Sequence, residues 1–364
     1  MHYANPKLIL NQEEIPAGRI AWRSPSNLAL VKYWGKYGRQ LPRNPSISFT
    51  LNNAFTETIL EYKAKVSNTE DIELDFFFEK KQNDNFRGKV LKFLESITDI
   101  FPFLPQLHLT IHSSNSFPHS TGIASSASAM SALAACLCSL ENKLFGSLAA
   151  SDDFLQKTSY VARLGSGSAS RSVYPYLAIW GVSEAAEGSS NLFAIPWGER
   201  VHPIFKTFHD VILIADGTEK SVSSRAGHGL MEGNIFAQNR YNQANQRFVK
   251  LLLALKEGDL QAFGEITENE ALTLHALMMT SEPSYILMRP NTLVMIEKIR
   301  AYRAKTQQPL YFSLDAGPNI HLLFPDEIKE DVFLFVKNEM ESLCENGKWI
   351  ADKVGTGTGL IMDS

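Results

Sequence analysis

"SNSFPHSTGIASSASAMSALAACLC", residues 114–138, places seven serines, one threonine and one glycine around a single junction. Beyond Ala124, apolar residues from Met130 to Leu140 recur at the spacing of one helix face, so the serines lie where a helix begins. The first turn of a helix has main-chain N–H groups without intrahelical partners and carries the positive end of the helix dipole. This stretch therefore predicts a helix start that binds phosphate.

The candidate phosphate ligands in this stretch are small residues. Gly122 permits a tight turn, and Ser125, Ser126 and Ser128 offer hydroxyls to a phosphate or to a metal bound to it. The alternative is that the serines cap the helix and pack against a neighbour, but one helix needs few caps. The spacing matches neither the P-loop pattern GxxxxGK[ST] nor GxGxxG.

A second Ser/Gly cluster, "ARLGSGSASRS" at residues 162–172, places Ser166 and Ser168 shortly before Arg171. The planar guanidinium of arginine matches a carboxylate or a phosphate with two parallel hydrogen bonds, so this cluster predicts a second anion site. A solvated arginine in a polar turn is the alternative interpretation of the cluster alone.

A third cluster lies in "SPSNLALVKYWGKYGRQLPRNPSISFTL", residues 24–51, where Lys32 and Lys36 enclose Tyr33. Strand-like alternation would place Lys32 and Tyr33 on opposite faces. Surface lysines usually serve solubility, but two lysines among aromatic residues, with Asn27 upstream, favour a binding role.

The fourth cluster is "SLDAGPNIHLLF", residues 313–324. Asp315 follows an apolar strand and precedes a Gly-Pro turn, where a carboxylate can be held rigidly against a ligand. The alternative is that Asp315 hydrogen-bonds its own turn.

The rest of the chain predicts an α+β protein of two lobes, residues 1–200 and 201–364. Alternating strands favour mixed or antiparallel sheets. The strands are expected at residues 46–51, 56–62, 107–112, 209–216, 309–314 and 320–324. Helices are expected at 152–164, with Ser151 as N-cap and Gly165 as the stop, and at 231–258 and 259–279.

Composition narrows the class of partner. With 44% hydrophobic and 20% charged residues the chain is typical of a globular protein, and its net charge of −4 gives no footprint for nucleic acid or an anionic membrane. Three sparse cysteines, of which Cys136 and Cys138 are expected to pack as small hydrophobes, fit a reducing compartment. The N-terminal sequence lacks a secretory pattern, so a cytoplasmic location is expected. The scattered histidines, His108 and His112 among them, do not favour a zinc site.

Six motifs together resemble one family. In chain order they are "NLALVKYWGK", "LPRNPSIS", "FPHSTGIASSAS", "GSGSASRS", "VSSRAGHGLM" and "DAGPN". The series resembles the mevalonate diphosphate decarboxylases of the galactokinase, homoserine kinase, mevalonate kinase and phosphomevalonate kinase (GHMP) superfamily. The resemblance implies a GHMP kinase-like fold whose active site lies in the cleft between the lobes.

The resemblance also implies a reaction. ATP, with Mg²⁺, would phosphorylate the 3-hydroxyl of mevalonate 5-diphosphate, after which phosphate and carbon dioxide leave together and isopentenyl diphosphate forms. Asp315 would orient or deprotonate the hydroxyl, Lys32 would stabilise charge beside it, and Arg171 would grip the substrate carboxylate. The remaining family contacts to the substrate fall on Asn27, Tyr33, Lys36, Ser166, Ser168, Ser223 and Arg225. Ser125 and Ser126 would cradle the ATP phosphates, and the family resemblance suggests a homodimer.

Other activities share this architecture. Relatives decarboxylate mevalonate 5-phosphate or only phosphorylate the 3-hydroxyl, and a non-catalytic metabolite sensor could use the same scaffold. The presence of Asp315, Lys32 and Arg171 argues against the kinase and the sensor, and Lys36 favours the diphosphate because an added phosphate brings more negative charge to be matched.

Overall fold

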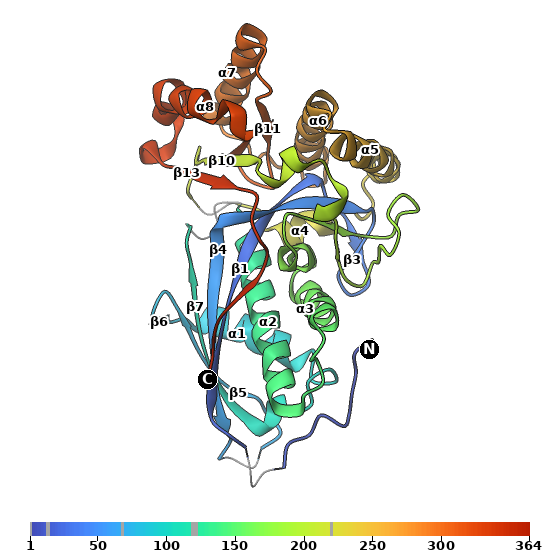
Figure 1. Cartoon of the computed structure of the whole chain (residues 1–364), viewed down its shortest axis with the longest axis vertical. Coiled ribbons are helices and arrows are strands. Elements are labelled where there is room, and N and C mark those ends of the chain that lie inside the picture. Colours follow the sequence, from blue (N-terminus) through green and yellow to red (C-terminus); the bar gives the residue numbers. More distant parts are fainter. Residues whose placement is uncertain (1, 12–14, 67–68, 118–122, 219–220) are drawn as a thin grey trace.

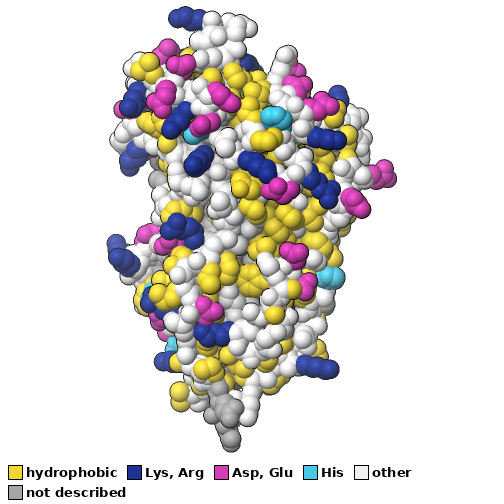
Figure 2. Space-filling model, viewed as in Figure 1, with side chains coloured by type: hydrophobic (Ala, Val, Ile, Leu, Met, Phe, Trp, Pro, Cys, Tyr) yellow, Lys and Arg dark blue, Asp and Glu magenta, His cyan; other side chains and the backbone are white. Residues whose placement is uncertain are grey.

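A computed structural model of the chain describes residues 2–11, 15–66, 69–117, 123–218 and 221–364. Figure 1 shows an elongated molecule in which one sheet, with α1, α2 and α3, forms one half, and a smaller sheet, with α5 to α8, forms the other. The described residues include no helix with the length and apolar character needed to cross a bilayer. On the face drawn in Figure 2, basic and acidic side chains are interspersed.

The larger sheet is antiparallel except where β5 and β7 run parallel. Its main path runs in the order β14-β1-β4-β7-β5-β6, and β8 and β9 extend it from β4. The strands are β1 (Gly18–Val31), β4 (Ser46–Ala64), β5 (Glu73–Phe78), β6 (Lys81–Gln82), β7 (Leu107–Asn115), β8 (Leu177–Trp180), β9 (Ile195–Pro196) and β14 (Gly359–Asp363).

One face of this sheet is covered by helices, and the apolar residues of the two layers form a continuous core. The helices are α1 (Asp84–Glu95), α2 (Ser125–Phe145) and α3 (Ser151–Gly165). Cys136 and Cys138 of α2 are fully buried in this core, as small hydrophobes would be, and burial raises the pKa of Cys138 to about 12. The sequence prediction for both cysteines is confirmed.

The smaller sheet is antiparallel, in the order β11-β12-β10-β13. Its strands are β10 (His209–Leu213), β11 (Tyr311–Ser313), β12 (Ile320–Phe324) and β13 (Trp349–Lys353). The helices that accompany it are α4 (Ser224–Gly229), α5 (Ala237–Glu257), α6 (Leu260–Met279), α7 (Pro290–Thr306) and α8 (Lys329–Phe335). A short hairpin, β2 (Lys36–Tyr37) with β3 (Leu41–Pro42), stands apart from both sheets.

Strand β4 joins two strands that the sequence predicted separately. The pairing of β1 with β4 skips several residues between Phe55 and Thr50. There the buried carboxylate of Asp352, on β13, accepts main-chain N–H groups from Asn52 and Ala54 at 2.9 and 2.7 Å. These contacts satisfy N–H groups that the interrupted ladder leaves unpaired, and they fasten the smaller sheet to the larger one.

The last strand returns to the first sheet. In Figure 1 the red strand descends from the half that holds β13 and ends beside β1. There β14 pairs with β1, Ile20 opposite Asp363. We propose lobes of residues 1–200 and 201–364, with β14 as the part of the second lobe that completes the sheet of the first.

Three local predictions were wrong. Helix α3 begins at Ser151 itself, with Ala150 as N-cap and no side-chain cap. The helix expected from residue 231 begins at Ala237, because α4 and a turn precede it. Lys32 and Tyr33 do not alternate across a strand, since β1 ends at Val31 and both side chains line one cavity.

Alanine substitutions at two helix glycines, Gly264 of α6 and Gly88 of α1, test how closely α6 packs on β11. A Cβ on Gly264 would lie 2.0 Å from the ring of Tyr311, whereas a Cβ on Gly88 of α1 would meet nothing within 4 Å. Gly264→Ala should therefore lower the free energy of unfolding by about 1–3 kcal/mol through overpacking. Gly88→Ala should raise it by up to about 1 kcal/mol, because alanine favours a helix. Urea denaturation measures both, and equal effects would contradict the packing of α6 on β11.

Candidate active site

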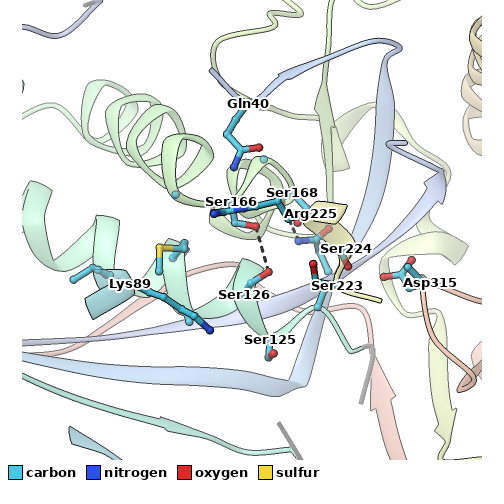
Figure 3. A pocket seen from close by; sticks show the side chains of 18 of the residues that line it. Gln40, Lys89, Ser125, Ser126, Ser166, Ser168, Ser223, Ser224, Arg225 and Asp315 are labelled. Carbon is cyan, nitrogen blue, oxygen red and sulfur yellow. Dashed lines mark hydrogen bonds between the residues drawn. The ribbon is translucent and has the colours of Figure 1, made fainter. Parts of the chain in front are cut away.

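A cavity of about 450 Å³ is lined by residues of both lobes. Its walls come from the end of β1 and the segment after it, the start of α2, the 3₁₀ segment Gly167–Val173, α4, and the turn that follows β11. Figure 3 shows Asp315 at one end, Lys89 toward the other, and Ser125 and Ser126 between them. The four polar clusters of the sequence therefore meet in one place.

Asp315 and Lys32 form an ion pair across the two lobes. The Lys32 Nζ lies 2.9 Å from the Asp315 Oδ1 and donates to the Ser313 Oγ at 3.0 Å. The lysine side chain is 2% exposed and that of the aspartate 22%. Burial opposes ionisation of Asp315, but the charges of Lys32, His321 and Arg171 outweigh burial and hold its pKa below the usual range. Asp315 is therefore a carboxylate at neutral pH.

Two buried histidines act on Asp315: His275 contacts its main-chain carbonyl, and the charge of His321 lowers its pKa. Burial lowers the pKa of His275 to about 4, so its neutral ring donates from Nε2 to the Asp315 carbonyl at 3.1 Å. The His321 Nδ1 lies 2.8 and 2.9 Å from the two carboxylate oxygens of Asp210. Burial opposes protonation of His321, yet Asp210 and Asp315 raise its pKa. The sequence pattern had not singled out either histidine.

Arg171 is buried, and the hydrogen bonds it makes within the described residues go to neutral groups. Its guanidinium donates to the hydroxyls of Ser46, at 2.6 Å, and of Ser48, and more distantly, at 3.4 Å, to the amide oxygen of Asn27. Burial lowers the pKa of Arg171 to about 10, which still leaves it charged at pH 7. Arg171 lines the cavity, and the Asp315 carboxylate is close enough to raise its pKa without forming a hydrogen bond to it, so the guanidinium can still pair with an anionic ligand.

Asn27 connects these groups to the Ser/Gly segment. Its amide nitrogen donates to the Ser168 carbonyl at 3.1 Å and to the Ser172 hydroxyl at 2.8 Å. The Ser166 hydroxyl lies 3.3 Å from that of Ser126 at the start of α2, as the dashed line in Figure 3 marks. The residue just before the 3₁₀ segment and the start of α2 therefore present their hydroxyls together.

The start of α2 has an unusual backbone. Ala124, its N-cap, is in the left-handed conformation, with φ 49° and ψ 40°, and has no side-chain cap. Ser125 and Ser126 line the cavity. Ser128 does not: it is fully buried, and its hydroxyl lies 2.6 Å from that of Thr56 on β4. The expected phosphate contact of Ser128 is corrected accordingly, and Gly122 lies outside the described residues.

The segment Tyr33–Lys36 faces α4. Among the described residues the buried Tyr33 hydroxyl has no hydrogen-bond partner, although it lines the cavity. Burial, then repulsion by Arg225, lowers the pKa of Lys36. Ser223 caps α4 by accepting the Ala226 N–H at 3.2 Å. These positions gather positive charge and an unsatisfied hydroxyl on one wall of the cavity.

Sequence reasoning missed several lining residues. His228 of α4 accepts the Gly35 N–H at 3.0 Å and packs on the rings of Tyr33 and Trp34. The motif "VSSRAGHGLM" contained His228 without any sign of its role. The far end of the cavity is apolar and is formed by Phe76, Phe78, Phe86, Met130 and Leu133, with Lys89 beside them.

Family models match both lobes of the chain. The diphosphomevalonate decarboxylase-like N-terminal domain matches residues 24–191, and the mevalonate 5-diphosphate decarboxylase C-terminal domain matches residues 210–354. The diphosphomevalonate decarboxylase of Ganoderma lucidum is 30% identical over 332 residues, which cover 86% of this chain and 80% of that protein.

Solved structures are similar over nearly the whole chain. The mevalonate diphosphate decarboxylase of Staphylococcus aureus is 26% identical, with a TM-score of 0.81, and the match covers 95% of this chain and 99% of that one. The complex of MDDEF with MVAPP, AMPPCP and magnesium is 28% identical, with a TM-score of 0.79 and the same coverage.

A two-lobed α+β fold whose Ser-rich helix start faces a shared cavity defines the class: it is the fold of the GHMP superfamily. Within that class the chain belongs to the diphosphomevalonate decarboxylase family. The fold class and the family predicted from the motifs are confirmed.

The cavity fits a magnesium ion that arrives with a nucleotide. Within the described ranges no group of three or more His, Cys, Asp and Glu side chains is placed to hold a metal. Mg²⁺ is commonly held by one or two protein oxygens together with phosphates and water. The Ser125 and Ser126 hydroxyls, which line the cavity, are oxygen donors of this kind.

Serine substitutions at the start of α2 test this placement. Ser125→Ala and Ser126→Ala should each weaken binding of an ATP analogue with Mg²⁺ about fivefold, the value of one hydrogen bond. Ser128→Ala should leave that affinity unchanged and cost about 1 kcal/mol of stability through the lost bond to Thr56. Titration calorimetry and thermal unfolding separate the two effects, and weaker binding in the Ser128 variant would contradict its placement.

Proposed function

We propose that the protein decarboxylates mevalonate 5-diphosphate with ATP, giving isopentenyl diphosphate, ADP, phosphate and carbon dioxide. The observation that carries the proposal is the meeting of Asp315, Lys32 and Arg171 at one end of a cavity that the Ser-rich start of α2 also lines. Family membership supports the same reaction.

Asp315 acts on the 3-hydroxyl. Because its pKa is held low, it is a weak base and a good hydrogen-bond acceptor, so it orients the hydroxyl oxygen toward the γ-phosphorus of ATP. The P–O bond to ADP breaks as the new P–O bond forms, and the hydroxyl proton passes to the Asp315 carboxylate that accepts its hydrogen bond. Phosphoryl transfer of this kind depends on positioning and charge stabilisation. Lys32 stabilises negative charge beside the reacting oxygen.

Arg171 acts on the carboxylate. Loss of phosphate breaks the C3–O bond and leaves an electron-poor tertiary carbon, and the C–C bond to the carboxylate then supplies the electrons of the new double bond. The Arg171 guanidinium, fixed by Ser46 and Ser48, holds that carboxylate in the orientation for departure. Asn27 fixes Arg171 and Ser168 in the same arrangement.

The remaining polar residues of the cavity suit the phosphates of ATP and the diphosphate of the substrate. Ser125 and Ser126 are placed for the phosphates of ATP at the positive end of α2. Lys36 and Arg225, which repel each other, and the Tyr33 hydroxyl suit the diphosphate of the substrate. Mg²⁺, held through the Ser125 and Ser126 hydroxyls, would neutralise phosphate charge.

The apolar end suits the base of the nucleotide. Phe76 and Phe86 from β5 and α1, and Met130 and Leu133 from α2, form walls on which a flat purine can pack. The Ser-rich turn of α2 would then place the phosphates between this end and Asp315, in the order that Figure 3 shows for the protein groups.

The proposal has two further parts: a homodimer, which the family resemblance suggests, and a cytoplasmic location, which the sparse cysteines suggest. Sedimentation of the purified protein and imaging of a tagged copy address them. Neither is required for the chemistry above, because every group named in it comes from one chain.

Asp315→Asn tests the central role. The amide cannot accept the hydroxyl as a carboxylate does and leaves Lys32 without its counter-charge, so kcat should fall about 10³-fold or more. Affinity for an ATP analogue should survive. Asp326→Asn, at an exposed carboxylate paired with His209, is the control and should turn over normally. Near-normal turnover by the Asp315 variant would refute its role.

Arg171→Gln tests the carboxylate contact. It should reduce carbon dioxide release about 100-fold or more, because the departing group loses its only guanidinium partner in the proposal. Arg163→Gln is the matched control: Arg163 is equally buried, has its pKa likewise lowered to about 10, and donates to main-chain carbonyls instead of lining the cavity. Thermal unfolding should show similar losses for both, and equal losses of kcat would remove Arg171 from the site.

A further inference from the structure

The main chain of Lys32 is held from the second lobe. Its N–H donates to the Glu270 Oε2 at 2.8 Å, and its carbonyl accepts from the Arg240 Nη2 at 3.2 Å. Glu270 and Arg240 in turn form two parallel hydrogen bonds, at 2.6 and 2.7 Å. The main chain of Lys32, in the first lobe, is therefore held by an ion pair between α5 and α6 of the second lobe.

This pair is costly to bury. The side chains of Arg240 and Glu270 are 1% and 0% exposed. Burial opposes ionisation of Glu270, but Arg240, with help from Arg247, lowers its pKa. Apolar residues of similar volume would join α5 to α6 at least as well, since buried ion pairs add little net stability. The hydrogen bonds to Lys32 are what an apolar pair could not provide.

Strand pairing does not continue through this point. β1 ends at Val31, so Lys32 is the first residue beyond the ladder. The Asn44 amide donates a second hydrogen bond to the Lys32 carbonyl, at 3.1 Å, whereas the Lys32 N–H donates to Glu270. The Lys32 side chain has four rotatable bonds, and the hydrogen bonds to its main chain fix the point from which it extends.

We propose that Glu270 and Arg240 are positioning residues that fix the main chain of Lys32 so that its ammonium stays on the Asp315 carboxylate. Neither Glu270 nor Arg240 lines the cavity. The consequence for turnover rests on the proposed function, whereas the consequence for Asp315 does not.

The experiment replaces the whole pair. In Glu270→Leu/Arg240→Met both charges of the buried pair are removed together, and Arg247, which is 20% exposed, loses its ion pair with Glu270 but keeps its bond to Thr273. The double variant should unfold near the wild-type temperature, while Glu270→Gln alone, which strands Arg240, should unfold well below it. If the pair served stability alone, the double variant would have normal activity when it is as stable as the wild type.

Two readouts report the position of Lys32. With a looser ammonium, Asp315 should titrate about one pH unit higher, seen by ¹³C NMR of aspartate-labelled protein and assigned with Asp315→Asn. The acid limb of kcat should move the same way, and kcat should fall at least about tenfold with less change in KM. Arg171, His321 and His275, which also face Asp315, are unchanged in this variant.

Arg240→Lys gives a second test that does not depend on replacing the buried ion pair with apolar side chains. It keeps a charge for Glu270 but lacks the fork that also reaches the Lys32 carbonyl, so the same shifts should occur at smaller size. Unchanged Asp315 titration in either folded variant would overturn the proposal. Wild-type protein without turnover would contradict the proposed function only, because the Asp315 titration is measured without substrate.

Discussion

The ammonium of Lys32 and the carboxylate of Asp315 lie 2.9 Å apart where the two lobes meet, and the remaining charged groups of the site are arranged around them. A buried ion pair is tolerated only when its geometry is good and its remaining hydrogen-bonding groups are satisfied. Here Ser313 takes a second contact of the ammonium, His275 holds the main chain of Asp315, and the Glu270–Arg240 pair holds that of Lys32. Holding this pair in place also holds the lobes together.

The electrostatics suit a reaction between two polyanions. Asp315 has cationic groups near it, so it stays ionised, and in the proposed reaction it positions a hydroxyl without acting as a strong base. Arg171 is buried among hydroxyls, and Lys36 repels Arg225 at the other side of the cavity. In the proposed reaction, negative substrate groups pair with these cations. The protein therefore binds them with charges that are already in position.

Local patterns in the sequence predicted the site better than the supports around it. Ser125, Arg171, Lys32 and Asp315 lie in compact motifs, and the structure brings them to one cavity. Ser128 was misassigned because helix phase, which turns it toward Thr56, outweighs membership of a serine run. Glu270 and Arg240 could not be found, because they reach Lys32 from 238 and 208 residues away and only the folded chain pairs them. Ser46 and Ser48 lie in the strand expected at residues 46–51, but alternation alone gave no sign that their hydroxyls accept from Arg171.

The most direct test incubates the purified protein with ATP and Mg²⁺, in parallel with mevalonate, mevalonate 5-phosphate and mevalonate 5-diphosphate, and measures ADP and carbon dioxide together. The account predicts equal amounts of ADP and carbon dioxide with the diphosphate alone. ADP without carbon dioxide would contradict it in favour of a kinase, and equal amounts with the monophosphate would contradict the assigned substrate. Neither product with any substrate would contradict catalysis itself.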